Sequence, residues 1–260
     1  MRCLTGDVET AWYEVGRGSP LVLIHGLADD HRGWRRALPR LMLDYRVILY
    51  DFRGHGASSL GQPDGRLAQL AGDLAALLDA LELERPSLAG FSLGGTIAMR
   101  FAIDYPDRLD RLMPVATSSR VGRAAAEWYV ERAGLADKGA EALLPHLEED
   151  TREQFKTAPE LAAEHMRIRR QSVADPRGYA NACRAMTRLR EEPLDPELAQ
   201  IKAPTLVIAG AEDHLCPPKA GEMIAAGIEG ARMEVIPDCG HQIPVQEPDR
   251  LAKLMLEFLA

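Results

Sequence analysis

Short apolar runs, each about the length of a strand, recur along most of the chain. The segments Pro20–His25, Tyr45–Tyr50 and Pro86–Phe91 are almost continuously apolar rather than alternating with polar residues. This pattern is typical of strands that are buried on both faces of a sheet. After a short opening strand, further strands are predicted at Thr10–Val15, Leu109–Ala116, Pro204–Ala209 and Arg232–Pro237.

Amphipathic segments separate these runs. Leucine and alanine recur three and four residues apart between Leu67 and Leu81, which predicts a helix with one buried stripe. Strands that alternate with helices require crossover connections, so the pattern predicts an α/β fold with a mostly parallel sheet. Other helical segments are predicted at Leu93–Ile103, around Trp34–Leu43, and near Gly221 and Leu251.

The alternation of strand and helix breaks once, between residues 118 and 196. This stretch has no buried-strand pattern and contains eleven Arg and two Lys against fourteen Asp and Glu, so it is nearly neutral. We interpret it as an all-helical cap inserted over the carboxyl edge of the sheet. The predicted division is a core domain of residues 1–117 and 197–260, with a helical cap of residues 118–196.

Composition narrows the class of protein without identifying it. The 260 residues are 46% hydrophobic and 27% charged, which is ordinary for a soluble globular domain. A net charge of −8 argues against a nucleic-acid-binding face, which needs clustered Lys and Arg. No apolar run is long enough to cross a bilayer, and the first residues do not resemble a signal peptide. The four cysteines lack metal-site spacing, so we expect free thiols and a cytoplasmic location.

The segment Gly90–Gly94 reads G-x-S-x-G between a predicted strand and a predicted helix. A sharp turn at this place forces its central residue, Ser92, into strained backbone angles, and the flanking glycines let the neighbouring backbone approach. The hydroxyl then stands at a helix N-terminus, where the helix dipole favours a developing oxyanion. Ser92 is therefore the predicted nucleophile.

A serine nucleophile needs a base, and the base needs an acid that orients it. In this topology the order along the chain is Ser, then Asp or Glu, then His. Asp213 and His241 each follow one of the last two predicted strands, at the same sheet edge as Ser92, and are the predicted acid and base. Glu212 remains an alternative acid. We expect the other candidate histidines, His214 in a loop and His146 and His165 in the cap, to be solvated.

The tetrahedral oxyanion formed by attack on a carbonyl needs two hydrogen-bond donors. The backbone N–H of Leu93 is one candidate, and the N–H of Leu27 in the loop after the third strand is the other. His25 precedes that loop, and we expect it to bond loop backbone rather than to transfer protons. The segment Asp51–Ser58 is predicted to support the site structurally.

With these residues placed, the chain resembles the α/β-hydrolase superfamily along essentially its whole length. The resemblance lies in His25-Gly26, D-x-R-G-H-G-x-S at 51–58, G-F-S-L-G-G at 90–95, Y-P-D-R-L at 105–109, G-x-E-D at 210–213 and G-H-x-x-P at 240–244. It implies an eight-stranded, mostly parallel sheet flanked by helices. Within the superfamily the chain is most similar to the group of 3-oxoadipate enol-lactonases and small esterases.

The cap is expected to set the substrate. Its aromatic and methionine side chains are equally candidates for pocket wall and for cap core, and the substrate-binding prediction is Trp128, Tyr129 and Met166, with Tyr179 and Met186 as further candidates. A dicarboxylate substrate would need a positively charged side chain to bind its second carboxylate. The balanced charge of the cap, however, indicates that most of its arginines form surface ion pairs. The arginines considered are Arg167, Arg169, Arg170, Arg184 and Arg188.

The sequence thus predicts a serine hydrolase that cleaves a small carboxylic ester or lactone without a metal or an organic cofactor. Two alternatives stay open at this point: hydrolysis of a C–C bond in a ring-cleavage diketone, and a non-catalytic small-molecule receptor on the same fold. The expected partner is a small molecule, with no nucleic acid and no membrane. The sequence leaves open whether the chain forms a homo-oligomer.

Overall fold

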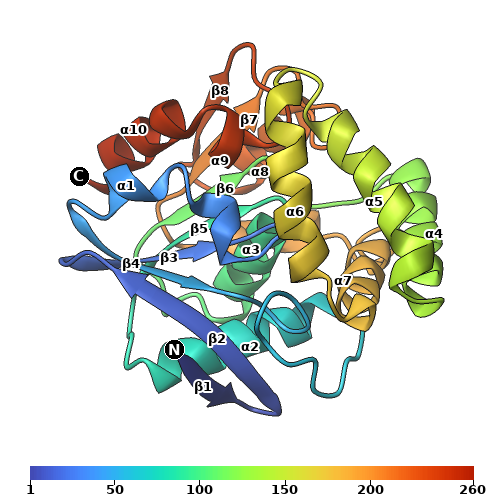
Figure 1. Cartoon of the computed structure of the whole chain (residues 1–260). Helices are drawn as coiled ribbons and strands as arrows, with labels where there is room; N and C mark the ends of the chain where they lie inside the picture. Colours follow the sequence, from blue (N-terminus) through green and yellow to red (C-terminus); the bar gives the residue numbers. More distant parts are fainter.

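The computed structural model describes residues 1–260 and is built around one eight-stranded sheet (Figure 1). The strand order is β1-β2-β4-β3-β5-β6-β7-β8. The pairs β1–β2 and β2–β4 are antiparallel. The remaining pairs, from β4 to β8 in the order of the sheet, are parallel. The strands are β1 (Arg2–Thr5), β2 (Val8–Val15), β3 (Ser19–Ile24), β4 (Tyr45–Tyr50), β5 (Ser87–Phe91), β6 (Leu112–Val115), β7 (Leu206–Gly210) and β8 (Arg232–Ile236).

Helices cover both faces of the sheet, as the apolar strands require. Alternate residues of a strand enter different cores: Val22 and Ile24 join one cluster, whereas Leu21 and Leu23 join another. The first cluster includes residues of α2, α3 and α8, and the second includes residues of α1 and α10. The α-helices outside residues 118–196 are α1 (Leu38–Leu41), α2 (Leu67–Ala80), α3 (Leu93–Asp104), α8 (Pro218–Gly227), α9 (Ile243–Gln246) and α10 (Pro248–Leu259). The predicted α/β fold is confirmed.

The segment 118–196 contains no strand. Its four α-helices lie together at one side of the sheet in Figure 1, and α4 packs closely against α7. Ten buried residues, mostly from this segment, form a third apolar core. Its helices are α4 (Arg123–Asp137), α5 (Ala140–Gln154), α6 (Ala162–Ser172) and α7 (Pro176–Arg188), with a short 3₁₀ turn at Pro159–Leu161. A further 3₁₀ helix, Asp195–Gln200, begins where the segment ends. We keep the name cap for residues 118–196, and its status as a separate domain stays a prediction.

One predicted helix is much shorter than the sequence pattern suggested. The stretch Trp34–Leu43 contains the end of a 3₁₀ turn (His31–Trp34) and the single turn of α1. Pro39 stands in that first turn, where its missing N–H costs nothing, so it also marks where a new helix begins. The connection from β3 to β4 is therefore mostly loop, and the part next to β3 approaches Ser92.

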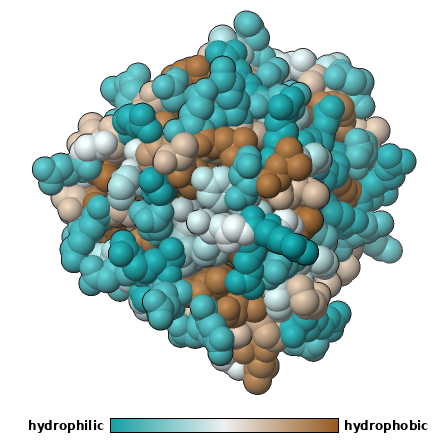
Figure 2. Space-filling view, turned by 90° about the vertical axis from the view of Figure 1, so that its left-hand side faces the viewer, coloured by the Kyte–Doolittle hydropathy of each residue, from teal (hydrophilic) through white to brown (hydrophobic).

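One face of the molecule carries mainly hydrophilic side chains, with brown hydrophobic groups between them (Figure 2). No helix is long and apolar enough to span a membrane.

Two buried histidines hold the loops that follow β3 and β4. His25 accepts the N–H of Phe52 at Nε2 (3.2 Å), donates from Nδ1 to the carbonyl of Gly26 (2.8 Å), and stacks on the Phe52 ring. His55 is fully buried against the same ring. Burial lowers the pKa of His55 to about 3 and also lowers the pKa of His25. Both side chains are thus neutral packing groups, in keeping with the structural role expected for His25.

The buried His55 should make stability depend on pH. Its pKa is about 3 in the folded protein and about 6.5 in the unfolded chain, so between these values only the unfolded chain binds this proton. Stability then falls as the pH falls below about 6.5, and His55 contributes about 2 kcal/mol to that loss by pH 5. Urea unfolding at pH 7 and pH 5 should show a smaller loss for His55→Gln than for wild type. His214→Gln, at an exposed position, should match wild type; equal losses for all three proteins would contradict the assignment.

Candidate active site

Ser92 lies at the sharp turn between β5 and α3. Its backbone angles, φ 52° and ψ −122°, are rare for a residue with a side chain and cost about 1–3 kcal/mol. Four hydrogen bonds hold them. The Ser92 N–H donates to the carbonyl of Val115 (2.9 Å). The Ser92 carbonyl accepts from the N–H groups of Gly95 (2.8 Å) and Thr96 (3.2 Å) and from the Thr117 hydroxyl (2.7 Å). The turn is thereby fastened to the end of the neighbouring strand β6.

The glycines around Ser92 are required by close backbone contacts. A Cβ atom on Gly90 would lie 2.2 Å from the Gly94 carbonyl oxygen, and one on Gly94 would lie 2.4 Å from the carbonyl oxygen of Ile24. These distances are far shorter than a van der Waals contact, and the atoms met are backbone. The G-x-S-x-G pattern therefore has the mechanical basis that the sequence suggested.

His241 and Asp213 lie beside Ser92 in an unbroken chain of hydrogen bonds. The Ser92 hydroxyl donates to His241 Nε2 (3.1 Å), and His241 Nδ1–H donates to Asp213 Oδ2 (2.8 Å). Asp213 follows β7 and His241 follows β8, so the parallel sheet brings all three to one edge. Asp213 is 1% exposed and His241 is 6% exposed, so water has little access to the hydrogen bond between them.

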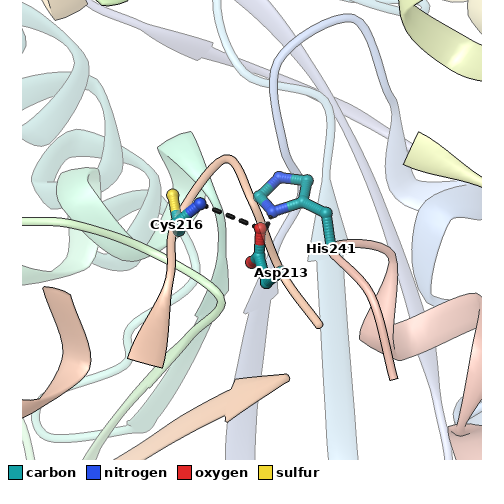
Figure 3. A group of neighbouring side chains, drawn as sticks. All are labelled: Asp213, Cys216 and His241. Carbon is teal, nitrogen blue, oxygen red and sulfur yellow. Dashed lines mark hydrogen bonds and ion pairs between the residues drawn. The ribbon is translucent and has the colours of Figure 1, made fainter. Parts of the chain in front are cut away.

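The structure distinguishes Asp213 from the alternative acid, Glu212. The second carboxylate oxygen of Asp213 accepts the N–H groups of Leu215 and Cys216, both at 2.9 Å, which fixes the carboxylate toward the imidazole (Figure 3). The side chain of Glu212 is exposed and makes no bond to His241. His214 is exposed as expected.

The predicted oxyanion donors belong to backbone segments next to Ser92. A Cβ atom on Gly26 would lie 3.3 Å from the Ser92 Cβ, so the loop after β3 passes directly over the serine. Leu27 follows in this loop, and its N–H donates to no protein acceptor. Leu93 is the first residue of α3, and its N–H has no earlier helical carbonyl to bond. Both N–H groups are free to bind a negatively charged oxygen.

A cavity of about 430 Å³ opens above the serine. That size suits a small substrate. Of the predicted pocket residues, Trp128, Tyr129 and Tyr179 line it, but Met166 and Met186 do not. The side chain of Met166 is instead packed in the apolar core of the cap, with its sulfur 3.5 Å from the Thr151 hydroxyl. The cavity lining also includes residues that the sequence analysis did not single out. Among them are Leu215, Cys216 and Pro217, which follow shortly after Asp213.

The expectation that His165 is solvated is wrong, because its side chain is buried. The side chain of Arg169 is also buried, although most of the cap arginines were expected to form surface pairs. Both side chains reach Asp29, in the loop after β3, with His165 Nε2 at 2.9 Å and Arg169 Nε at 3.0 Å from Asp29 Oδ1. Their spacing of four residues puts them on one face of α6, which was the available signal, but the sequence could not name the partner on the core.

Asp213, Cys216 and His241 also have the chemistry of a metal-ligand set, and their ligand atoms lie within 4.8 Å of one another (Figure 3). However, both Asp213 oxygens already accept hydrogen bonds. Burial raises the pKa of the Cys216 thiol, so the thiolate that binds metals is disfavoured. The group fits a proton-transfer site better than a metal site.

A serine on this turn, facing a His–Asp pair across the carboxyl edge of a parallel sheet, is the arrangement found in α/β hydrolases. The family model for the alpha/beta hydrolase fold matches residues 19–248, and the chain belongs to this family.

The chain is similar to relatives that are named for several different hydrolase activities. The chain is 30% identical to 3-oxoadipate enol-lactonase 2 of Acinetobacter baylyi, over 88% of this chain and 84% of the relative. It is 27% identical to 2-hydroxy-6-oxo-2,4-heptadienoate hydrolase of Pseudomonas putida, over 99% and 95% of the two chains. The crystal structure of the enol-lactonase from Burkholderia xenovorans LB400 superposes with a TM-score of 0.90 at 28% identity, covering 100% and 99%.

The glycine contacts give a stability prediction. Gly94→Ala should lower the free energy of unfolding by more than about 2 kcal/mol, because the new methyl group meets the Ile24 carbonyl. Gly72→Ala is the matched control: Gly72 lies inside α2, and a Cβ there meets nothing within 4 Å. That change should raise stability by about 0.5–1 kcal/mol. Urea unfolding measures both, and a neutral effect of Gly94→Ala would contradict the packing described for the turn.

Proposed function

We propose that this protein is a serine hydrolase that cleaves a small carboxylic ester or lactone through an acyl-enzyme intermediate. The observation that carries the proposal is the continuous hydrogen-bond chain from Ser92 through His241 to Asp213, at the base of the cavity. Membership of a hydrolase family and the enol-lactonase relatives support it.

In the first half-reaction the Ser92 oxygen attacks the substrate carbonyl carbon. As that bond forms, the hydroxyl proton moves to His241 Nε2, and the imidazolium is stabilised by the Asp213 carboxylate at Nδ1. The carbonyl oxygen becomes an oxyanion that accepts from the N–H groups of Leu27 and Leu93. When the tetrahedral intermediate collapses, the bond to the leaving oxygen breaks and Nε2 returns the proton to that oxygen.

In the second half-reaction water replaces the alcohol. His241 Nε2 takes a proton from water as the water oxygen attacks the acyl carbon, and a second tetrahedral intermediate forms in the same oxyanion site. Its collapse breaks the bond to the Ser92 oxygen, which recovers the proton. The protein is restored and the acid is released. In a lactone the alcohol and the acid remain parts of one molecule.

Hydrolysis of a C–C bond is the second candidate. It is favoured by the Pseudomonas putida relative, which is named for a heptadienoate substrate and aligns along 99% of this chain. The same triad would serve a ring-cleavage diketone. A coloured dienoate of this class separates the two proposals, since its colour is lost only if the C–C bond is cleaved. If the colour persists, hydrolysis of a C–C bond is rejected.

The nucleophile is tested first. Ser92→Ala should reduce kcat for p-nitrophenyl acetate by at least about a thousandfold, because no acyl-enzyme can form. Circular dichroism and urea unfolding check that the variant stays folded. Retention of the wild-type rate in a folded variant would reject Ser92 as the nucleophile.

The orienting acid is tested with a neighbouring pair of changes. Asp213→Asn keeps the shape but removes the charge that stabilises the imidazolium, and kcat should fall by about a hundredfold to ten-thousandfold. Glu212→Gln makes the same chemical change at an exposed adjacent position and should stay within about twofold of wild type. The reverse order of effects would assign the acid to Glu212 instead.

A further inference from the structure

Besides His241, three charged side chains line the cavity: Arg120, Asp150 and Arg169. A charged substrate group would have to find an unpaired partner among them. Whether the cavity attracts a charged substrate therefore depends on how each of these groups is already neutralised.

Arg169 is held by protein groups on three of its nitrogens. Nε donates to Asp29 Oδ1 (3.0 Å), one terminal nitrogen to the Thr151 hydroxyl (2.9 Å), and the other to the Gln154 side-chain oxygen (2.6 Å). Arg169 is 2% exposed and Asp29 is 0% exposed. His165 bonds the same carboxylate oxygen, and burial lowers its pKa, so it adds no positive charge at neutral pH. The Arg169–Asp29 pair is thus internally neutral.

The other two charges are paired in the same way. Asp150 makes a two-pronged contact with Arg132, with both N–O distances at 2.8 Å. Arg120 pairs with Asp195 at 2.8 Å, and this pair differs from the others because the Arg120 side chain is about half exposed. Around the cavity, three arginines therefore face three aspartates, and the Asp213 carboxylate behind His241 adds one further negative charge.

The remaining cationic side chains of the cap do not reach the cavity. Arg170 pairs with Glu148 and Arg184 with Asp137, both at exposed positions. Arg167 and Arg188 also lie outside the cavity lining. The lining is otherwise mostly hydrophobic, with twelve apolar residues of twenty-two, and it includes Tyr129 and Tyr179.

We infer that the acyl pocket selects uncharged esters and lactones and discriminates against substrates that carry a second carboxylate. This inference rests on the proposed function and adds its substrate class. A carboxylate entering the cavity loses its hydration and meets no unpaired cation, which is costly. An apolar acyl chain carries no charge that must be desolvated, and the mostly hydrophobic lining suits it.

Two esters of equal acyl length test the inference in the wild-type protein. In p-nitrophenyl hexanoate the acyl chain ends in a methyl group, and in mono-p-nitrophenyl adipate it ends in a carboxylate. We expect kcat/KM to be at least about tenfold higher for the hexanoate, after the rate in buffer is subtracted. Equal or faster hydrolysis of the adipate ester would overturn the inference without the use of any variant.

Asp29→Asn tests the cause of this selectivity. The amide retains an oxygen for Arg169 and His165, and its nitrogen takes the place of Asp29 Oδ2, which has no partner. Arg169 would then carry an uncompensated charge beside the cavity. The hexanoate-to-adipate ratio of kcat/KM should fall by about tenfold, and a ratio taken on one protein cancels any general loss of activity.

Asp137→Asn is the matched control, because it removes the same charge from an exposed arginine pair outside the cavity. Its substrate ratio should equal that of wild type. An unchanged ratio in folded Asp29→Asn would overturn the role of the Arg169–Asp29 pair. Failure of the proposed function is recognised separately: neither ester would be hydrolysed, and a fluorophosphonate would not label Ser92.

Discussion

The strained backbone of Ser92 is the constraint on which the site depends. A residue with a side chain holds φ 52° only because the surrounding structure leaves it no alternative. Glycines at 90 and 94 admit the neighbouring backbone, and Thr117 at the end of β6 holds the Ser92 carbonyl. The packing of the adjacent strands β3, β5 and β6 thus offsets the energetic cost of the strained Ser92 backbone. The serine oxygen is held at the N-terminus of α3, next to the loop after β3.

That loop also receives the cap. Asp29 stands two residues after Leu27, and α6 holds it through His165 and Arg169. Gln154 continues the contact, since its side-chain oxygen accepts from Arg169 (2.6 Å) and from Gln242, the neighbour of His241 (2.8 Å). This polar cluster therefore joins the cap to both sides of the site. It also neutralises Arg169, the cation that would otherwise face a substrate.

Sequence reasoning predicted the fold and brought Ser92, His241 and Asp213 together because both results depend on local signals. Apolar runs marked the strands, and Ser92, Asp213 and His241 each follow a strand that ends at the same edge. It failed where distant segments meet: the bond between Asp29 and His165 spans 136 residues, and only the folded chain pairs them. Met166 shows a second limit, because helical spacing does not distinguish a residue of the cap core from one that lines a cavity.

The central claim, a covalent acyl-enzyme on Ser92, is tested most directly by acid quench and mass spectrometry. The protein is mixed with p-nitrophenyl acetate, quenched during turnover and digested. The account predicts one acetyl group on the peptide that contains Ser92 and none on the peptide that contains Cys216, the cysteine in the cavity lining. Acetyl on Cys216, or turnover without any acetylated peptide, would contradict it.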